Sequence, residues 1–578
     1  MRNVVAAILL AGGALALLPL VGLPLFYESF LYLVFHWIVL ATSWNILSGY
    51  SGYFSFGHGA FFGAGMYTTA VLATRYDVPF LLTLPAAALV AMVLGVALGA
   101  VVFRVKRVRG ELFALATLAF TFVVGTIVLN TPIDGGPGIA LSGVAVPAIG
   151  RSAASSFYLL ALALGVGTLI IAYAVYVSKL GTGLFAIHDD EDVAEVLGVP
   201  TFRYKMAAFA LSCALAGVAG GLQALFVSYV TVSETFSIIV PLSVVLMSVL
   251  GGTRHWAGPA VGAALITGLL YAFTAGDHAL AGKVVFGVVL IAVILFMPDG
   301  VLGRFTARRQ RHRRIPPITV AQEPLPALTR IPRVAVGEPL LVARGVRKAF
   351  RGVRALDGVD LDVRRGEILG LIGPNGSGKS TFINLVSGHY RADAGTLLFE
   401  GHDIAARDAH RIARAGIART CQIPRPFAHL SVRDNVALPA MFGADALDRS
   451  AALSEARRWL AFTGLSPHAD AFPEELNLHQ RKFLELARAL AARPRLLLLD
   501  EVLSGLTPGE INDAVDLIRA IRDDGATIVF VEHVMRAVMA LSDRLVVLDH
   551  GIVIAEGNAT AVMEHPDVVT AFLGRACA

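Results

Sequence analysis

Long apolar stretches recur through the first half of the chain, with short polar segments between them. A helix needs about 20 apolar residues to cross the hydrocarbon core of a bilayer. The first stretch continues to about Phe26 without a clear small-x-small cleavage site, which favours a retained helix over a signal peptide. We therefore expect residues 1–303 to form a polytopic all-α membrane domain. It would have about ten transmembrane helices, near residues 4–25, 30–47, 57–75, 83–103, 112–130, 157–177, 207–229, 237–251, 258–275 and 284–297.

The hydrophobic pattern changes after residue 303. Residues 304–338 are polar, basic and proline-rich, which is typical of a linker. In residues 339–578 short apolar runs are bounded by polar residues, as expected for buried strands. The chain is therefore predicted to be multi-domain, with a membrane domain followed by a water-soluble domain.

Composition agrees with this division. The chain is 56% hydrophobic with a mean hydropathy of +0.68, which is high for a soluble protein. Residues 1–303 hold 12 basic and 12 acidic side chains, and the remainder holds 36 and 31. The charge density of the first part is thus roughly a third of that of the second. The three cysteines, Cys213, Cys421 and Cys577, are scattered and indicate neither a disulfide framework nor a zinc site.

Basic residues in the connecting loops predict the orientation of the spans, because Lys and Arg gather on the cytoplasmic side. The loop 131–156 carries only Arg151 and should face outward. The alternation places both termini inside. The run 304–314 reads as a membrane-flanking anchor at lipid headgroups; a nucleic-acid site is the less favoured reading. The residues that mark the inner side are Arg104, Lys106, Arg107, Arg109, Lys179, Arg203, Lys205 and the run from Arg304 to Arg314.

The loop 179–206 is acidic, yet Ala194, Val196 and Leu197 recur at helical spacing. It predicts a short helix that docks onto a cytoplasmic domain. The alternative is a solvated amphipathic connector.

Few polar residues occur within the spans, among them His36, Asn45 and His58. Hydrogen bonding within the bundle is favoured over substrate contact for each of them. Gly59 and Gly63 are four apart and favour close helix packing. They are not a nucleotide-binding motif, since no strand precedes them.

The clearest chemical signal is a glycine-rich segment after the apolar strand 368–372. It matches G-x-x-x-x-G-K-[ST], with a helix predicted to begin near Lys379. Backbone amides of such a loop surround phosphate oxygens, the lysine adds a point charge and the Ser380 hydroxyl offers a ligand to Mg²⁺. The segment consists of Gly373, Pro374, Asn375, Gly376, Ser377, Gly378, Lys379, Ser380 and Thr381.

Two further strands are predicted to end in functional residues. The strand 495–500 ends at Asp500, which can hold Mg²⁺ through water, and Glu501 follows as the carboxylate that polarises the attacking water. The strand 527–533 ends at His533, which we interpret as a γ-phosphate sensor, although a lone histidine is often structural.

Together these motifs resemble the ATP-binding cassette family over about residues 340–575, with an α/β P-loop NTPase fold. The resemblance implies ATP and Mg²⁺ as cofactors. It also implies that Phe350 stacks on adenine, that Gln422 links Mg²⁺ to the permease interface, that residues 504–507 form the D-loop and that His533 is the switch histidine.

The family's Leu-Ser-Gly-Gly-Gln signature is altered in this chain. Residues 476–480 read Leu-Asn-Leu-His-Gln, so that the serine and both glycines are replaced. The resemblance implies that Asn477, His479 and Gln480 reach the nucleotide held by a second cassette.

The membrane half resembles the permeases of branched-chain amino-acid importers. The resemblance implies ATP-driven uptake of branched-chain or related small amino acids, with a separate periplasmic binding protein and a second permease–ATPase half. That half is either a homologous chain, which is favoured, or a second copy. Urea or short amides stay open as substrates, and export of lipid or drug or a non-transporting regulatory ATPase is less favoured. The segments that carry the resemblance are 43–52, 56–62, 109–118, 135–138, 191–198, 250–259 and 555–574.

Overall fold

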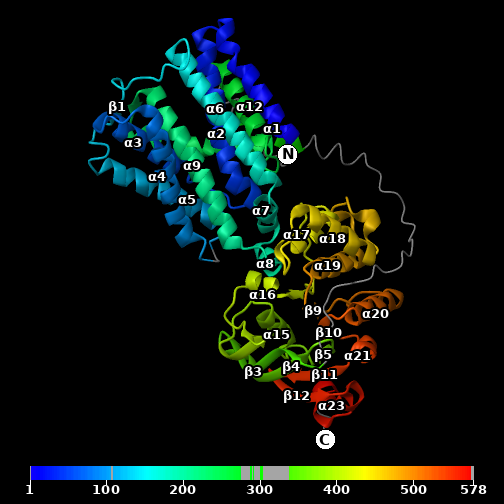
Figure 1. Cartoon of the computed structure of the whole chain (residues 1–578). Coiled ribbons are helices and arrows are strands. Elements are labelled where there is room, and N and C mark those ends of the chain that lie inside the picture. The colour runs from blue at the N-terminus through cyan, green and yellow to red at the C-terminus, as the bar shows by residue number, and fades with distance from the viewer. Residues whose placement is uncertain are drawn as a thin grey trace. The chain divides into compact units, whose positions relative to one another are not determined.

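The computed structural model describes residues 2–105, 108–274, 287–288, 291, 300–303 and 337–573. The chain divides into two compact units (Figure 1). One comprises Met1–His188 and Thr201–Arg314, and the other comprises Asp189–Pro200 and Ile315–Ala578. The short segment 189–200 therefore groups with the second unit although it lies between two helices of the first. The basic run 304–314, Lys106, Arg107, Cys577 and nearly all of the linker 304–338 lie outside the described residues.

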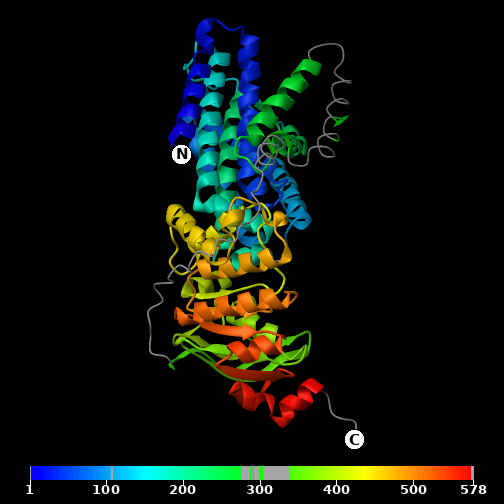
Figure 2. The same ribbon diagram turned by 90° about the vertical axis from the view of Figure 1, so that its right-hand side faces the viewer.

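The first unit is a bundle of helices, and its long members run side by side in Figure 2. Two short strands, β1 (Ile139–Ala140) and β2 (Tyr229–Val230), pair antiparallel beside it. The helices are α1 (Arg2–Ala16), η1 (Leu18–Val21), α2 (Leu25–Ser51), α3 (His58–Arg75), α4 (Phe80–Val102), α5 (Glu111–Leu129), α6 (Ala153–Val177), α7 (Lys179–Asp189), α9 (Thr201–Val227), α10 (Val232–Thr235), α11 (Ile239–Gly251) and α12 (Gly258–Thr274).

Within the described residues, seven helical segments are long and apolar enough to cross a membrane. This confirms the predicted polytopic helical domain. Two more predicted spans are present as α3 and α12; α12 is apolar but shorter, and α3 carries His58, Arg75 and several small or hydroxylated residues. The predicted span 284–297 lies almost entirely outside the described residues. The seven segments are Arg2–Val21, Leu25–Ser51, Phe80–Val102, Glu111–Leu129, Ala153–Val177, Thr201–Val227 and Val232–Gly251.

Small residues let α3 approach its neighbours closely. A Cβ atom on Gly65 would lie 2.0 Å from the Gly217 carbonyl oxygen of α9, and one on Gly63 would lie 2.5 Å from the Phe236 ring. His58 is buried in the same region, with its Nε2 atom 3.2 Å from Ser43 Oγ of α2 and 3.4 Å from Ser212 Oγ of α9. The polar side chain of His58 thus bonds within the bundle, as the sequence predicts.

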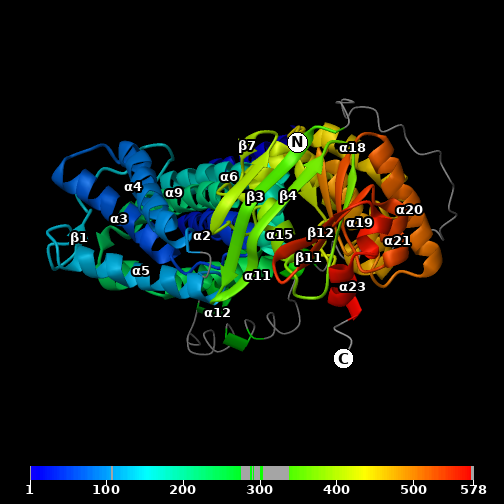
Figure 3. The ribbon, with the colours of Figure 1, turned by 90° about the horizontal axis from the view of Figure 1, so that it is seen from below.

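The second unit contains two sheets. The larger is six-stranded in the order β12-β11-β5-β10-β9-β8, parallel except for β12. The smaller is antiparallel, in the order β4-β3-β6-β7, and Figure 3 shows its long strands β3 and β4 side by side. The strands are β3 (Pro339–Phe350), β4 (Val353–Arg364), β5 (Ile368–Ile372), β6 (Ala394–Phe399), β7 (His402–Asp403), β8 (Ile417–Arg419), β9 (Leu496–Asp500), β10 (Thr527–Val531), β11 (Arg544–Asp549) and β12 (Ile552–Gly557).

Helices complete this unit, and Figure 1 shows α17, α18 and α19 grouped together. The helix α8 comes from the segment 189–200 that interrupts the first unit. The helices are α8 (Glu191–Val196), α15 (Lys379–Val386), α16 (Ala409–Ala415), α17 (Val432–Phe442), α18 (Arg449–Phe462), α19 (Leu478–Ala491), α20 (Pro508–Asp523), α21 (Met535–Leu541), α22 (Ala559–Met563) and α23 (Pro566–Leu573), with short 3-10 turns at Ser466–His468 and Pro473–Glu475.

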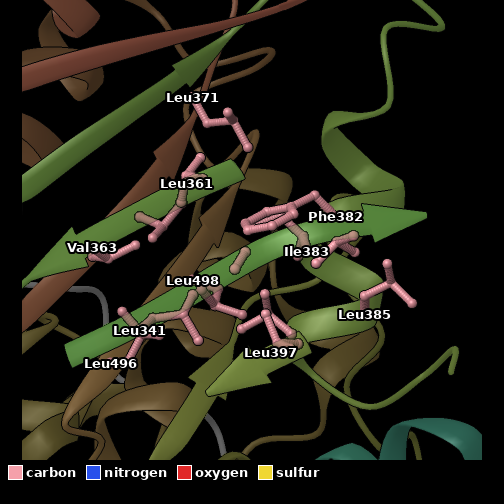
Figure 4. Close-up of a cluster of buried hydrophobic side chains, with 14 of the residues drawn as sticks. Leu341, Leu361, Val363, Leu371, Phe382, Ile383, Leu385, Leu397, Leu496 and Leu498 are labelled. Atoms are coloured by element: carbon pink, nitrogen blue, oxygen red, sulfur yellow. The ribbon is translucent and has the colours of Figure 1, made fainter. Parts of the chain in front are cut away.

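The core of this unit lies between the two sheets and α15, where Leu341, Leu371, Phe382 and Leu498 are buried (Figure 4). The central strands β5, β9 and β10 are buried along their whole length, which explains why their sequences are continuous apolar runs instead of alternating ones. Two boundaries differ from prediction. β9 begins at Leu496 rather than at residue 495, and β10 ends at Val531, so that Glu532 and His533 follow the strand.

Candidate functional site

The glycine-rich loop joins β5 to α15. Gly373, Gly376 and Gly378 all have positive φ, at 147°, 81° and 108°. A Cβ atom at Gly373 would lie 2.0 Å from the Leu548 carbonyl oxygen, and one at Gly378 would lie 2.6 Å from the Ala355 carbonyl oxygen. Conformation therefore favours glycine at all three positions, and lack of space also requires it at Gly373 and Gly378. The loop ends at the N-terminus of α15, where unpaired amides favour an anion.

Lys379 is buried beneath this loop. Its Nζ atom donates to the carbonyl oxygens of Gly373 at 2.8 Å and Pro374 at 2.9 Å, and lies 3.5 Å from Ser377 Oγ. Burial lowers the pKa of Lys379, and the nearby carboxylates of Glu501 and Asp500 oppose that shift. The ammonium group is thus held inside the loop by main-chain oxygens, and a phosphate would replace them as its partner. Asn375, Gly376 and Ser380 are exposed beside it.

Glu501 lies between two side chains from other parts of the sequence. Gln422 Nε2 donates to Glu501 Oε2 at 2.7 Å, and His533 Nε2 lies 3.2 Å from Glu501 Oε1. The three residues meet because β8, β9 and β10 are parallel neighbours, so that their carboxyl ends share one edge of the sheet. The sequence assigned roles to all three, and the structure brings them together.

Asp500 occupies the buried end of β9. Its backbone N–H donates to Thr420 Oγ1 at 3.1 Å, and its Oδ2 atom lies 3.7 Å from Arg419 NH2. Among the described residues, Oδ1 has no hydrogen-bond partner although it is buried. Burial raises the pKa of Asp500, and Arg419 opposes the shift.

This donor set fits a magnesium ion. An unpartnered buried carboxylate oxygen is costly unless a cation or water completes it, and Mg²⁺ prefers oxygen ligands. Asp500 offers the carboxylate, Ser380 an exposed hydroxyl and Gln422 a side-chain carbonyl that its bond to Glu501 leaves available.

Arg419 is a site residue that the sequence did not single out. It contacts Asp500, and its NH1 atom also donates to Ser387 Oγ at 3.1 Å. Its position at the end of β8, three residues before Gln422, was the signal available.

Phe350 ends β3 with its ring partly exposed. The ring lies edge-on to Tyr390 at a centroid distance of 5.0 Å, and Lys348 Nζ lies 5.4 Å from its centre. An exposed aromatic face of this kind suits stacking on a base. Tyr390 adds a second ring that the sequence did not indicate.

The altered signature segment forms the start of α19. Asn477 is the N-cap: its Oδ1 atom accepts the Gln480 N–H at 2.8 Å, and Gln480 Oε1 accepts the Asn477 N–H at 3.0 Å. Gln480 Nε2 also lies 3.0 Å from His468 Nε2. The polar groups of these two residues thus bond within the chain.

His479 packs against the same helix. Its ring centre lies 4.3 Å from that of Phe483, and its Nδ1 atom lies 3.9 Å from Glu510 Oε1. The imidazole therefore occupies space that a glycine would leave open.

The segment 189–200 supplies a docking helix to this unit, as the sequence predicts. Asp189 pairs with His429, whose N–H donates to Asp189 Oδ2 at 3.0 Å. Arg425 NH1 lies 3.4 Å from Asp190 Oδ2. Helix α8 packs beside α16, and a Cβ atom on Gly198 would lie 2.4 Å from the Phe442 carbonyl oxygen.

The buried face of α8 differs slightly from the predicted one. Ala194 and Leu197 are buried as expected, but Val193 is buried in place of Val196, which stays half-exposed. The helix is capped by Asp190, whose Oδ1 atom accepts the N–H groups of Asp192 and Val193 at 3.0 Å.

Comparison with known proteins assigns both halves. Residues 26–294 match the family described as the branched-chain amino acid transport system permease component, and residues 356–504 match the ABC transporter family.

Single proteins are also similar to the second half. The high-affinity branched-chain amino acid transport ATP-binding protein BraF of Pseudomonas aeruginosa is 34% identical over 255 residues, covering 42% of this chain and 100% of BraF. The probable branched-chain amino acid transport ATP-binding protein LivG of Archaeoglobus fulgidus is 36% identical over 245 residues, covering 41% and 95%. A crystal structure of a nucleotide-free ATP-binding cassette from an ABC transporter is 30% identical, covers 41% of this chain and 100% of its own, and has a TM-score of 0.38.

Proposed function

The chain belongs to the ABC transporter family, as a permease joined to an ATP-hydrolysing cassette, and from that premise we propose that it imports branched-chain or related small amino acids. One observation carries the proposal: a single polypeptide matches the branched-chain permease family in one half and cassettes named for branched-chain amino acid transport in the other. Urea or a short amide is the alternative substrate, because the family that the membrane half resembles also includes importers of these solutes.

The cassette would hold ATP by its phosphates in the loop 373–378. Lys379 would exchange the Gly373 and Pro374 carbonyl oxygens for the β- and γ-phosphates, and Phe350 would stack on the base. A bound Mg²⁺, held through Ser380, Gln422 and Asp500, would neutralise charge on those phosphates. Glu501 would then orient the attacking water, after its carboxylate leaves Gln422 and His533.

The assembly requires a second half. The signature segment 476–480 serves a nucleotide bound to another cassette, so the site is completed by a homologous permease–ATPase or a second copy of this chain. We favour the homologue, because this family normally pairs two different permeases. A separate periplasmic binding protein would deliver the solute. The bundle would sit in the bacterial inner membrane, with both termini and the cassette in the cytoplasm.

Movement would pass through the segment 189–200. It contacts Arg425 and His429, which follow shortly after Gln422 in the sequence, and Gln422 contacts Glu501 directly. This arrangement supports a role for α8 as the link between nucleotide state and the permease.

The direct test is ATPase activity of the reconstituted complex with and without the binding protein. Import predicts that hydrolysis rises when a leucine-loaded binding protein is added, and that Glu501→Gln abolishes the rise. Stimulation by urea or acetamide with its own binding protein, and none by leucine, would select the alternative substrate. Stimulation by lipid or drug without any binding protein would instead identify an exporter.

A further inference from the structure

Helix α19 buries three charged side chains spaced three residues apart. The exposed fractions of Lys482, Glu485 and Arg488 are 6%, 4% and 0%. Lysine, glutamate and arginine are almost never buried unless each finds a partner. Each of the three forms hydrogen bonds with main-chain groups: Lys482 with the turn at residues 501–504, and Glu485 and Arg488 with the loop at Arg425. We call Lys482, Glu485 and Arg488 the α19 charge row.

Lys482 holds the turn that carries the catalytic carboxylate. Its Nζ atom donates to the Glu501 carbonyl oxygen at 3.2 Å and also to the Ser504 carbonyl oxygen. Glu501 has a positive φ of 51°, which is unusual for a residue with a side chain. Its N–H donates to the Val531 carbonyl oxygen at 2.9 Å. The turn is therefore held in an uncommon conformation by several partners. Lys482 is the side chain that binds the Glu501 carbonyl oxygen, and the Glu532 carboxylate accepts the Leu503 N–H at 2.6 Å.

Glu485 and Arg488 hold the other loop. The Arg425 N–H donates to Glu485 Oε1 at 3.0 Å, and Arg488 NH1 donates to the Arg425 carbonyl oxygen at 2.9 Å. The Arg488 guanidinium also stacks on the Phe427 ring at 4.6 Å and pairs with Glu485. The peptide groups on both sides of Arg425 are thus clamped, while its side chain reaches Asp190 in the permease loop segment.

Two connections therefore run from the loop at Arg425 to Glu501. The first is the Gln422 side chain, which reaches the Glu501 carboxylate. The second passes through helix α19. Glu485 and Arg488 bind the main chain at Arg425, and Lys482, on the same helix, binds the Glu501 carbonyl oxygen. The first acts on the side chain of the catalytic residue and the second acts on its main chain.

We propose that the α19 charge row transmits the state of the permease loop at Asp190 to the main chain of Glu501. Its members are positioning residues: none would touch nucleotide, and they set where the Glu501 carboxylate lies. Because α19 begins at the signature segment, a displacement of this helix also moves residues 476–480. The proposal depends on ATP hydrolysis alone and does not require the substrate or direction of transport proposed above.

A double-mutant cycle on ATP turnover tests the proposal. The full chain, assembled with its second half in lipid nanodiscs, would carry Asp190→Asn, Lys482→Met or both, with Lys482→Arg as the conservative variant. Asp190→Asn alone is expected to change kcat by about fivefold, the lower end of typical coupling between sites, with KM for ATP unaltered. In the Lys482→Met background, Asp190→Asn should have no further effect on kcat, because the contact between α19 and the Glu501 carbonyl oxygen is already lost. In the Lys482→Arg background, Asp190→Asn should again lower or raise kcat as it does alone.

Additive effects of Asp190→Asn and Lys482→Met on kcat would overturn the proposal, since a purely structural lysine predicts additivity. Arg493→Gln is the matched control: Arg493 pairs with Glu455 at 2.8 Å near the end of the same helix, away from Glu501, and its effect should add to that of Asp190→Asn. If Lys482→Met fails to assemble, Glu485→Gln replaces it in the same cycle, with the same non-additivity expected. The cycle measures only ATP turnover. Its result can therefore be interpreted even if the chain does not import amino acids.

Discussion

Gln422 donates its side-chain amide to the Glu501 carboxylate across 2.7 Å, while His533 occupies the other oxygen of that carboxylate at 3.2 Å. Both oxygens of the proposed catalytic residue are thus engaged by groups that the sequence places 79 and 32 positions away. A water molecule at this carboxylate would compete with Gln422 and His533, although each oxygen can accept more than one hydrogen bond. Nucleotide binding is the event expected to separate them, since both partners are assigned to contacts around the γ-phosphate and Mg²⁺.

Glu501→Gln should abolish most turnover and preserve ATP binding. The amide cannot accept a proton from water, whereas the phosphate contacts of residues 373–381 are unchanged; loss of a general base typically costs about 100-fold or more in rate. Steady-state hydrolysis and equilibrium binding of a fluorescent ATP analogue measure the two effects. Asp516→Asn, on the exposed face of α20, serves as a control that changes one carboxylate elsewhere. Near-normal hydrolysis, with the other cassette also disabled, would show that Glu501 is not the catalytic carboxylate.

Leu197→Asp should uncouple ATP hydrolysis from transport. Leu197 is buried where α8 docks, so a carboxylate there loses its hydration and weakens the docking. Nucleotide affinity should change little, because the hydrogen bonds described above for the loop 373–378 are made within the loop and to Lys379, not to this helix.

Val196→Asp is the matched control for that change, since Val196 lies on the same helix and is half-exposed. Uptake and ATPase rates measured on the same vesicles give the coupling ratio. If Leu197→Asp transports normally at normal expression, the segment 189–200 does not couple the halves.

Cysteines introduced on opposite sides of the bundle should label from opposite sides of the membrane. Gly143→Cys lies in the loop 131–156 and should react in intact cells with a membrane-impermeant maleimide. Val105→Cys, in the basic loop after α4, should react only after the membrane is opened. Both positions are exposed. Labelling of Val105→Cys and protection of Gly143→Cys in intact cells would reverse the proposed orientation.

His479→Gly should preserve or raise hydrolysis at the site that residues 476–480 close. The imidazole fills space beside the start of α19, where a glycine would allow closer approach to phosphate. With a partner that carries a normal signature, we expect two unequal sites, of which this is the slower. Single-turnover hydrolysis measures this site alone if the other site is blocked by substituting the lysine of its phosphate-binding loop, the equivalent of Lys379. A collapse of activity would instead identify His479 as a phosphate ligand.

The sequence predicted most of the residues that meet at this edge of the sheet, because their signals are local. Continuous apolar runs specify strands buried on both faces, and Asp500, Glu501 and His533 follow directly from their ends. The parallel order of those strands then brings the side chains together without further information.

What the sequence did not predict depends on distant partners. Lys482, Glu485 and Arg488 look like the polar face of an amphipathic helix, and only the fold shows that they are buried against loops at 425 and 501. Of the apolar residues that indicated α8, Ala194 and Leu197 are buried but Val196 is half-exposed, because its surroundings depend on distant parts of the chain. The sequence did not predict Arg419 as a site residue either, because its partner Asp500 is distant in the sequence.

The central claim is that this chain couples ATP hydrolysis to amino-acid import, and uptake of radiolabelled leucine into proteoliposomes tests it most directly. The vesicles would contain this chain with its second half, ATP would be supplied on the cassette side, and loaded binding protein would be supplied on the other. The account predicts leucine accumulation that requires both ATP and binding protein and is lost in Glu501→Gln. ATP hydrolysis without any accumulation of leucine, isoleucine or valine under these conditions would contradict it.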